Sequence, residues 1–436
     1  MKRDIYKRLI DWKDDPLRKP LILKGARQTG KTYILKELGE REFEHTAYFN
    51  FEENPALNDF FDCALNPGKI LEKLSIYSEK AITPGKTLIF FDEIQESPRA
   101  LTSLKYFSEL NEKYYIVSAG SLLGIKVGAS SSFPTGKVDF LDLYPFSFGE
   151  FLSGLGKEKL RGLLNDIADF NPIDGVFHRE LIDHLKLYFY IGGMPEAVNR
   201  YNTDKDLNEI RKIHKAILQG YENDFSKHSG KTESIKLAGA WRAIPAQLAK
   251  ENKKFKYSEI SKYARAREYN DIVTWLQDAG LVYKSYNIDT PKLPLSGYKN
   301  ENIFKLFLLD VGLLGDMLNL SPKPIIAGDE LFSEYNGAYT ENFVAQELTA
   351  KGFDELYYWT SARTAEVDFV LFYDENIYPL EVKAGAGRQK KSLKLYGQKY
   401  KNSVLSMATT RNFKHDGQLY NYPLYAVNRF PIQPNK

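Results

Sequence analysis

A glycine-rich run at residues 25–32, GARQTGKT, sets the strictest condition on the fold of this 436-residue chain. The run fits the pattern G-x-x-x-x-G-K-[ST], follows the apolar stretch PLILK and leads into YILKELGE, which favours a helix. Glycines let a loop between strand and helix wrap closely around an anion, so that backbone N–H groups and the helix N-terminus face it. The pattern predicts a phosphate-binding loop, with Lys31 on the β- and γ-phosphates of a nucleotide and the Thr32 hydroxyl on Mg²⁺.

The tripeptide GKT also occurs at residues 85–87 and 230–232, but only the first copy has a glycine five residues upstream. We therefore expect nucleotide contacts from the first copy alone. Besides Lys31 and Thr32, the loop residues that we expect to bind the nucleotide are Gly25, Arg27, Gln28, Thr29 and Gly30.

An acidic pair, Asp92 and Glu93, ends the apolar run TLIFFDE. In open α/β sheets, ligands bind at the carboxyl ends of the strands. We therefore expect Asp92 to hold the Mg²⁺ shell and Glu93 to orient or deprotonate the attacking water. Taken alone, such a pair also marks a strand that ends in solvent, and the phosphate loop upstream favours the functional interpretation.

Polar residues follow the next apolar run, YYIVS, within the sequence SAGS. Ser118 and Ser121 are candidates for a hydrogen bond to the nucleotide or to the attacking water. A turn of small residues explains the same pattern, so both interpretations stay open. Gln95 and Arg99, just after Glu93, are further candidate helpers.

Short apolar runs alternate with helical patterns in the first half of the chain, which is typical of a parallel sheet covered by helices. The predicted strands are residues 21–24, 46–52, 87–92, 114–118 and 138–143. We predict an α/β protein in four parts: a P-loop ATPase core at residues 1–150, a helical lid at 151–229, a winged-helix domain at 230–325 and a second α/β domain at 326–436.

Four motifs, GARQTGKT, TLIFFDEIQ, VSAGSLL and FLDLYPFSFGEFL, resemble the prokaryotic AAA-type P-loop ATPases of the class with an additional catalytic glutamate. GGMPEAV, IFKLFLLDVGLLG, GAYTENFVAQEL, and EVDFVLF with IYPLEVKAG resemble the C-terminal region that these ATPases share. The resemblance spans nearly the whole chain. It implies ATP binding and a sheet in which the strand of the acidic pair lies near the strand of the phosphate loop.

The middle of the chain, after residue 230, is locally basic and predicts two helices and a hairpin. Ser258 is a candidate N-cap for a helix through SEISKYA, and a second helix, EYNDIVTWLQDA, ends at Gly280. Polar and basic side chains around the second helix suit the base edges and phosphates of DNA; they are Asn270, Thr274, Gln277, Arg265, Arg267 and Lys284. A winged-helix module that only packs against its neighbouring domains explains the same sequence.

Acidic residues recur in the last part of the chain. Glu341 lies on the apolar face of a predicted helix, where a carboxylate is costly unless a metal or a partner compensates it. EVDFVLF and IYPLEVK flank YDEN, a four-residue hairpin turn that sets Asp368 opposite Glu381. Two carboxylates this close repel each other, which suggests a bound divalent cation.

This spacing resembles the PD-(D/E)xK nuclease fold, which implies a restriction-endonuclease-like α/β domain. The resemblance implies Mg²⁺ on Asp368 and Glu381, Glu341 as the helical acidic residue, and Lys383 as the group that orients the attacking water or stabilises negative charge. The next helix carries cations suited to a phosphate backbone, Arg388, Lys390, Lys391, Lys394 and Lys399. E-x-K also occurs by chance in a chain of this length, and a retained site need not cleave.

Composition narrows the setting in which the protein works. Sixty basic and 57 acidic residues give a net charge of +3, so any nucleic-acid contact must come from local patches. The single cysteine, Cys63, excludes an internal disulfide and fits a reducing compartment. A charged N-terminus and the lack of a long uncharged apolar stretch predict a cytoplasmic protein without membrane contact.

Two functional hypotheses follow from these patterns. In the first, a Mg²⁺-dependent ATPase couples its nucleotide state to movement of the lid and winged helix relative to a nuclease-like domain that acts on DNA. In the second, the chain is a nucleotide-dependent switch or partner-binding protein with a catalytically inert C-terminal domain. Both require ATP, and both allow a homo-oligomer.

Overall fold

The computed structural model describes residues 2–62, 65–110, 114–120, 134–228, 230–250, 253–262, 264–321, 336–361, 365–385, 390–401 and 404–432. Two compact units divide the chain. Unit 1 is Met1–Tyr144 with Asp278–Gly280, and unit 2 is Pro145–Gln277 with Leu281–Lys436. The division into four parts at residues 150, 229 and 325 stays a prediction.

A parallel five-stranded sheet forms the centre of unit 1. Its strands are β1 (Leu21–Lys24), β2 (His45–Asn50), β3 (Thr87–Asp92), β4 (Tyr115–Ala119) and β5 (Asp139–Asp142), in the order β2-β3-β4-β1-β5. The structure confirms all five predicted strands to within two residues at each end. Because β4 lies between β1 and β3, the loop strand and the acidic strand are near each other but not adjacent.

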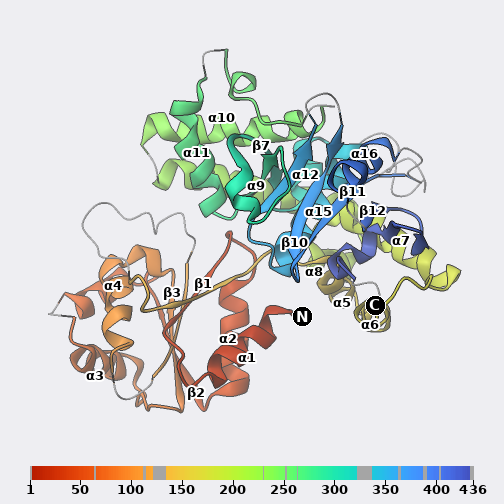
Figure 1. The fold of residues 1–436 in the computed structure, drawn as a ribbon. Coiled ribbons are helices and arrows are strands. Elements are labelled where there is room, and N and C mark those ends of the chain that lie inside the picture. The colour runs from red at the N-terminus through yellow and green to blue at the C-terminus, as the bar shows by residue number, and fades with distance from the viewer. Residues whose placement is uncertain are drawn as a thin grey trace. The chain divides into compact units, whose positions relative to one another are not determined.

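Helices cover both faces of this sheet (Figure 1). α1 (Ile5–Asp14) and α2 (Lys31–Glu42) pack on the face that carries Leu88 and Phe90 of β3. α3 (Pro67–Ser78), α4 (Pro98–Phe107) and the 3₁₀ segment η1 (Pro55–Phe61) pack on the face that carries Ile89 and Phe91. Strands buried on both faces require apolar residues at nearly every position, which is why β3 reads TLIFF before its acidic end.

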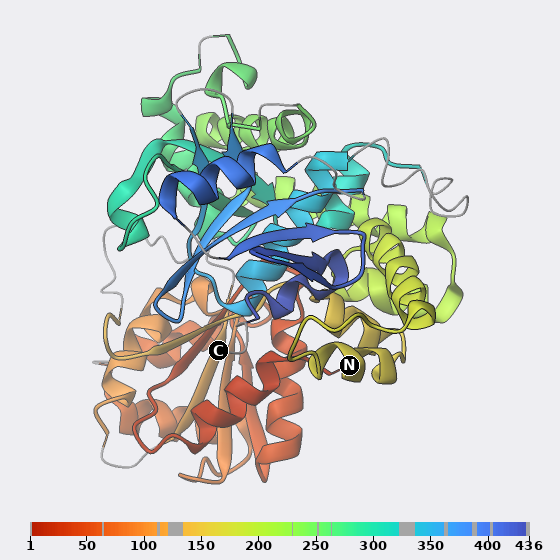
Figure 2. The ribbon, with the colours of Figure 1, turned by 45° about the vertical axis from the view of Figure 1, so that its right-hand side comes forward.

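Unit 2 begins with helices, as predicted for residues 151–229 (Figure 2). They are α5 (Phe148–Gly154), α6 (Glu158–Asn165), α7 (Gly175–Ile191), α8 (Pro195–Asp204) and α9 (Leu207–His228), followed by α10 (Lys231–Leu248). α5 starts with a capping box between Ser147 and Glu150. α7 ends at the predicted GGMP turn, where Gly192 has a φ of 72°.

Buried Asp310 joins this turn to the start of α12 (Val311–Met317). Its Oδ2 accepts the Gly193 N–H at 2.6 Å, and its Oδ1 accepts the Leu313 N–H at 3.0 Å as the N-cap of α12. A Cβ on Gly192 would lie 2.1 Å from Asp310 Oδ1. The GGMP and DVGLLG motifs are therefore two halves of one packed junction.

The basic middle region contains the 3₁₀ turn η4 (Tyr257–Glu259), α11 (Ala266–Asp278) and the antiparallel strands β6 (Val282–Ile288) and β7 (Lys299–Leu308). The prediction of a helix through SEISKYA is wrong, since only η4 forms there. Phe255 stacks on Phe304 of β7 and Tyr257 contacts the same ring edge to face, and this packing holds the segment in a non-helical conformation. α11 is confirmed, and its predicted inward residues are buried: Tyr269, Ile272, Leu276 and Ala279.

Two sheets complete unit 2. β6 and β7 share one sheet with β8 (Leu356–Thr360) and β9 (Glu366–Val367), in the order β7-β6-β8-β9. The other sheet has the order β10-β11-β12-β14-β13, with β10 (Phe369–Tyr373), β11 (Asn376–Val382), β12 (Leu405–Thr409), β13 (Lys414–Asp416) and β14 (Leu419–Pro423). α15 (Asn336–Lys351) packs against β7 and β11, and α16 (Lys391–Tyr400) against β9, β11 and β12. No helix among the described residues is long and apolar enough to cross a bilayer.

Candidate functional site

Residues 25–30 connect β1 to α2 with three left-handed backbone positions. These are Gly25 (φ 150°), Gln28 (φ 64°) and Gly30 (φ 95°). Gly25 admits no side chain, because a Cβ would lie 2.3 Å from the Leu143 carbonyl oxygen. Gly30 is the N-cap of α2 and supplies no capping side chain, so the first-turn N–H groups of the helix are suited to an anion.

Lys31 is buried at the start of α2, and its Nζ donates to the Gly25 and Ala26 carbonyl oxygens at 2.9 Å each. Burial lowers the pKa of Lys31 to about 8, against the opposing charges of Glu93 and Asp92. Those charges act on Lys31 because the loop and the end of β3 meet at one edge of the sheet. The structure therefore brings the predicted lysine and the predicted acidic pair together.

Asp92 and Glu93 at the end of β3 have different surroundings. The Asp92 carboxylate is buried and accepts hydrogen bonds from the Tyr48 hydroxyl at 2.9 Å and from the Glu93 N–H at 3.1 Å. Glu93 has left-handed backbone angles (φ 51°, ψ 45°), which cost a non-glycine residue about 1–2 kcal/mol. Its carboxylate accepts a hydrogen bond from Gln95 Nε2. Strain of this kind, retained at a strand end, is typical of functional positions.

Two supporting residues of this site, Arg3 and Tyr48, were missed in the sequence, whereas the candidate helper Gln95 donates a hydrogen bond to Glu93. Arg3, which precedes α1, holds the loop by donating to the Thr29 carbonyl oxygen at 3.1 Å. Tyr48 could have been found from strand alternation, since it shares a face with Asn50, the β2 residue paired with Asp92.

The remaining candidate residues either lie away from the acidic pair or fall outside the described residues. Ser118 pairs with Phe91 and Ile22 in the sheet, so its side chain lies on the face opposite to Asp92. Arg99 donates from Nε to the Phe61 carbonyl oxygen at 2.7 Å, at the end of η1. Ser121 lies outside the described residues.

In unit 2, the β10–β11 hairpin sets the two predicted carboxylates against each other. Phe369 pairs with Leu380, which places Asp368 opposite Glu381 as predicted, and the turn residues Asp374 and Glu375 are both left-handed. Asp368 Oδ2 accepts the Val382 N–H at 2.7 Å.

The charges at this pair are only partly compensated. Lys383 Nζ lies 2.6 Å from Glu381 Oε1, whereas Glu381 Oε2 is buried without a hydrogen-bond partner. Burial, with the nearby charges of Glu341 and Glu381, raises the pKa of Asp368. Burial also raises the pKa of Glu381 against the opposing charge of Lys383.

A buried lysine that sequence reasoning missed, Lys305 of β7, lies among the neighbouring carboxylates. Its side chain is 1% exposed, and its ammonium lies 3.1 Å from Glu341 Oε2, 2.6 Å from Glu366 Oε1 and 3.9 Å from Asp368 Oδ1. Lys253 forms a second ion pair with Glu341. Although burial opposes them, these two lysines lower the pKa of Glu341.

The expected three-carboxylate metal site stays a prediction. No group of three or more His, Cys, Asp or Glu side chains in the described part of the chain is arranged to hold a metal ion. Lys253 and Lys305 compensate the charge of Glu341 without a metal, and its place beside the other two carboxylates as a ligand stays a prediction. Asp368 and Glu381, with Lys383, remain a two-carboxylate candidate site.

A scan against known families matches three parts of the chain. Residues 17–152 match a model described as an AAA domain. Residues 182–324 and 336–426 match two models described as domains of unknown function, DUF8612 and DUF4143. No curated protein matches the chain.

Several solved structures resemble the chain at low identity. The Walker-type ATPase of Pyrococcus abyssi is 14% identical, with 73% of this chain and 95% of that chain covered and a TM-score of 0.45. The Aeropyrum pernix ORC1 protein in complex with DNA is 13% identical, with coverages of 74% and 92% and a TM-score of 0.30. The Thermotoga maritima RuvB Holliday junction branch migration motor is 13% identical, with coverages of 67% and 90% and a TM-score of 0.29. These scores assign no function to this chain. The parallel sheet, the phosphate loop and the family match together identify residues 17–152 as an AAA-type domain with a P-loop NTPase fold.

Proposed function

We propose that the chain is a Mg²⁺-dependent ATPase that binds ATP on the loop at residues 25–32. The observation that carries this proposal is the buried Lys31 ammonium, held by loop carbonyl oxygens within electrostatic reach of Asp92 and Glu93. A desolvated ammonium beside an uncapped helix N-terminus is matched to a polyphosphate. The residues present therefore fit the nucleotide.

Each residue of the site has a definite task in this proposal. Lys31 binds the phosphates, and Thr32 and Asp92 hold Mg²⁺, which supplies charge stabilisation at the phosphate oxygens. Tyr48 fixes the orientation of the Asp92 carboxylate through its 2.9 Å hydrogen bond. Glu93 takes the proton of the attacking water, and Gln95 positions the Glu93 carboxylate.

Two variants with a matched control test this proposal. Lys31→Ala is expected to abolish ATP binding, because it removes the cation from the loop. Glu93→Gln is expected to keep ATP binding and to lower the rate of phosphate release by about 10²–10⁴, the usual contribution of a general base. Lys7→Ala, which removes an exposed cation of α1, should change neither. Normal ATP affinity in Lys31→Ala would overturn the proposal, and normal turnover in Glu93→Gln would overturn the role of Glu93.

One observation favours a second activity, metal-dependent cleavage of DNA in unit 2. Glu381 Oε2 is a buried, unpartnered acceptor beside Asp368, whose pKa burial and nearby carboxylates raise. A divalent cation would relieve both conditions, and there it would polarise a phosphodiester. Lys383, already 2.6 Å from Glu381, would orient water or stabilise negative charge.

Incubation with DNA and Mg²⁺ or Mn²⁺ tests this second activity. Asp368→Ala is expected to abolish cleavage, while Asp354→Ala, which removes an exposed carboxylate, should retain it. Cleavage that persists in Asp368→Ala would come from a contaminant. The alternative would then stand, in which unit 2 is catalytically inert and the ATPase acts as a switch or partner-binding protein.

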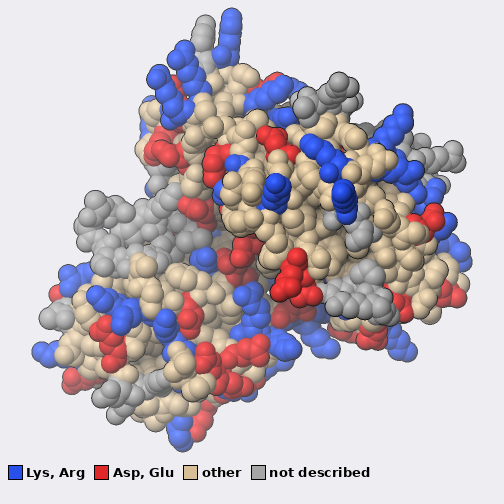
Figure 3. Space-filling model, in the orientation of Figure 1, with Lys and Arg blue, Asp and Glu red and all other residues tan. Residues whose placement is uncertain are grey.

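The winged-helix interpretation of residues 230–325 belongs to the same proposal. Lys and Arg side chains gather over α10 and α11 in Figure 3. Arg265, just before α11, and Arg267 within it are exposed. Thr274 is exposed on α11, and Asn270 accepts the Tyr257 hydroxyl at 2.6 Å. The sheet that β6 and β7 share with β8 and β9 favours a packing role for the hairpin, and the exposed cations favour DNA contact through α11.

A further inference from the structure

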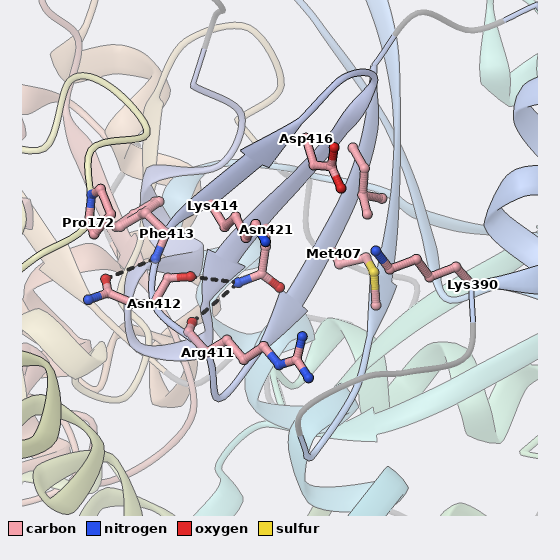
Figure 4. Close-up of a pocket in the computed structure, with 10 residues that line it drawn as sticks. Pro172, Lys390, Met407, Arg411, Asn412, Phe413, Lys414, Asp416 and Asn421 are labelled. Atoms are coloured by element: carbon pink, nitrogen blue, oxygen red, sulfur yellow. Dashed lines mark hydrogen bonds between the residues drawn. The ribbon is translucent and has the colours of Figure 1, made fainter.

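A cavity of about 460 Å³ lies in unit 2 over the strands β12, β13 and β14 (Figure 4). Its floor is apolar and includes Met407 and Leu419. Its rim carries three cations, Lys390, Arg411 and Lys414. The volume lies in the range of cavities that hold small organic ligands, so one nucleotide-sized group fits.

Strand register ties this cavity to the carboxylate pair of the β10–β11 hairpin. Glu381 pairs with Met407, Met407 with Asn421, and Asn421 with Lys414. Paired residues of neighbouring strands share a face, so these four side chains form one row across the sheet. The cavity therefore begins one strand, about 4.8 Å, from Glu381.

The rim cations are not neutralised by the protein. Within the described residues, no carboxylate lies at ion-pair distance from Lys390, Arg411 or Lys414, and Asp416 is the acidic side chain among the lining residues. Figure 4 shows Lys390 and Arg411 extending toward Met407 from opposite sides. Unpaired cations around an apolar floor suit a ligand with an anionic group and a flat apolar group.

Hydrogen bonds hold the rim in place. Asn421 Nδ2 donates to the carbonyl oxygens of Arg411 at 3.2 Å and Asn412 at 3.0 Å. Asn412 in turn exchanges two hydrogen bonds with the backbone of Ile173, in the loop before α7. The backbone that carries Arg411 is therefore fixed before any ligand binds, which lowers the entropic cost of binding.

We propose that this cavity binds one nucleotide of a single-stranded nucleic acid. The phosphate lies against Lys390, Arg411 and Lys414, and the base covers the floor at Met407 and Leu419. Cation–phosphate contacts with base packing are the means by which proteins bind single strands without reading their sequence. This inference rests on the proposed DNA-cleaving site, because it places the bound nucleotide next to the phosphodiester at Asp368 and Glu381.

Binding of a short fluorescent oligothymidylate to the full chain, followed by anisotropy without divalent metal, tests the cavity. Arg411→Ala and Lys414→Ala are each expected to weaken binding about tenfold and to reduce the slope of log K against log[salt] by about one. Lys159→Ala, which removes an exposed cation of α6 outside the cavity, should leave affinity unchanged. An abasic strand of equal length should bind about tenfold more weakly, because it cannot cover the floor.

The outcomes separate the cavity from the cleavage site. Asp368→Ala is expected to lose cleavage and keep oligothymidylate binding. If the wild type binds oligothymidylate but does not cleave DNA, the cavity proposal is supported and the nuclease proposal is overturned. Wild-type affinity in both Arg411→Ala and Lys414→Ala, or absent binding by the wild type, would overturn the cavity proposal. Equal affinity for the abasic strand would overturn the contact with the base. Circular dichroism and thermal melting confirm that each variant is folded.

Discussion

Replacing Lys305 with methionine removes the buried positive charge of unit 2 and keeps an unbranched side chain of similar size. In the wild type the ammonium lies 2.6 Å from Glu366 and 3.1 Å from Glu341. Removing one partner of a buried ion pair costs about 3–5 kcal/mol, because the other charge is left without compensation. Lys253 still pairs with Glu341 and Glu366 is partly exposed, so we expect a loss near the lower end, about 3 kcal/mol.

Urea unfolding followed by tryptophan fluorescence measures this loss. Trp241, Trp275 and Trp359 lie in unit 2, and a Trp12→Phe background removes the signal of unit 1. Lys250→Met is the matched control, because Lys250 pairs with Glu259 on the surface at 2.6 Å and should contribute far less. Equal losses in the two variants would refute the role of Lys305 as the internal counter-ion.

Acidification supplies an independent check on the same charge. The two lysines hold the pKa of Glu341 below its usual value, and such a carboxylate stabilises the fold above its unfolded pKa and loses that contribution as pH falls. Without Lys305, ionised Glu341 stabilises the fold less, so the variant loses less stability on acidification. The difference in the free energy of unfolding between wild type and Lys305→Met should therefore narrow as pH falls from about 5 to about 2, where folded Glu341 takes up its proton. A difference that is constant over this range would contradict an electrostatic origin.

Three further predictions concern the junction at Asp310 and the phosphate loop. Gly193→Ala should destabilise the protein by several kcal/mol in urea unfolding, because its Cβ would lie 2.2 Å from the Phe146 carbonyl oxygen. Gly162→Ala is the contrasting change: its Cβ would meet no atom within 4 Å, so it should stabilise α6 by about 0.5–1 kcal/mol. Burial raises the pKa of Asp310 to about 6, so the folded state holds a proton that the unfolded state has released, and stability should fall by about 2 kcal/mol as pH rises from 4 to 6. Asp310→Asn should remove this slope. ATP affinity should decrease above pH 8, where the buried Lys31 loses the proton that phosphates require, and calorimetric titrations at several pH values check it.

Local patterns predict the parts of this fold whose causes are local. All five strands of unit 1 are confirmed, because a strand buried on both faces needs a nearly continuous apolar run. The register of the β10–β11 hairpin is confirmed as well, since a short turn leaves only one pairing. The phosphate loop is equally local, because its glycines and its lysine lie within eight residues.

Features that depend on distant partners were not predictable. α15 has no single apolar face, because its polar side chains are buried against segments far away in the chain. Asn342 exchanges two hydrogen bonds with the backbone of Leu308, and Glu347 accepts the Phe148 N–H at 2.7 Å. Helical periodicity cannot show these partners, since it reports only which positions share a face.

The cluster around Lys305 shows how this limit applies to the expected three-carboxylate metal site. A carboxylate on a buried helix face must be compensated, and sequence alone offers a metal as readily as a protein cation. The same chain contains the converse problem, because the lysine in IFKLFL interrupts an apolar strand and needs an anion. Glu341 of α15 and Lys305 of β7 lie 3.1 Å apart, so each compensates the buried charge of the other. Two isolated buried charges of opposite sign within one compact unit should therefore be tested as partners before either is assigned a metal.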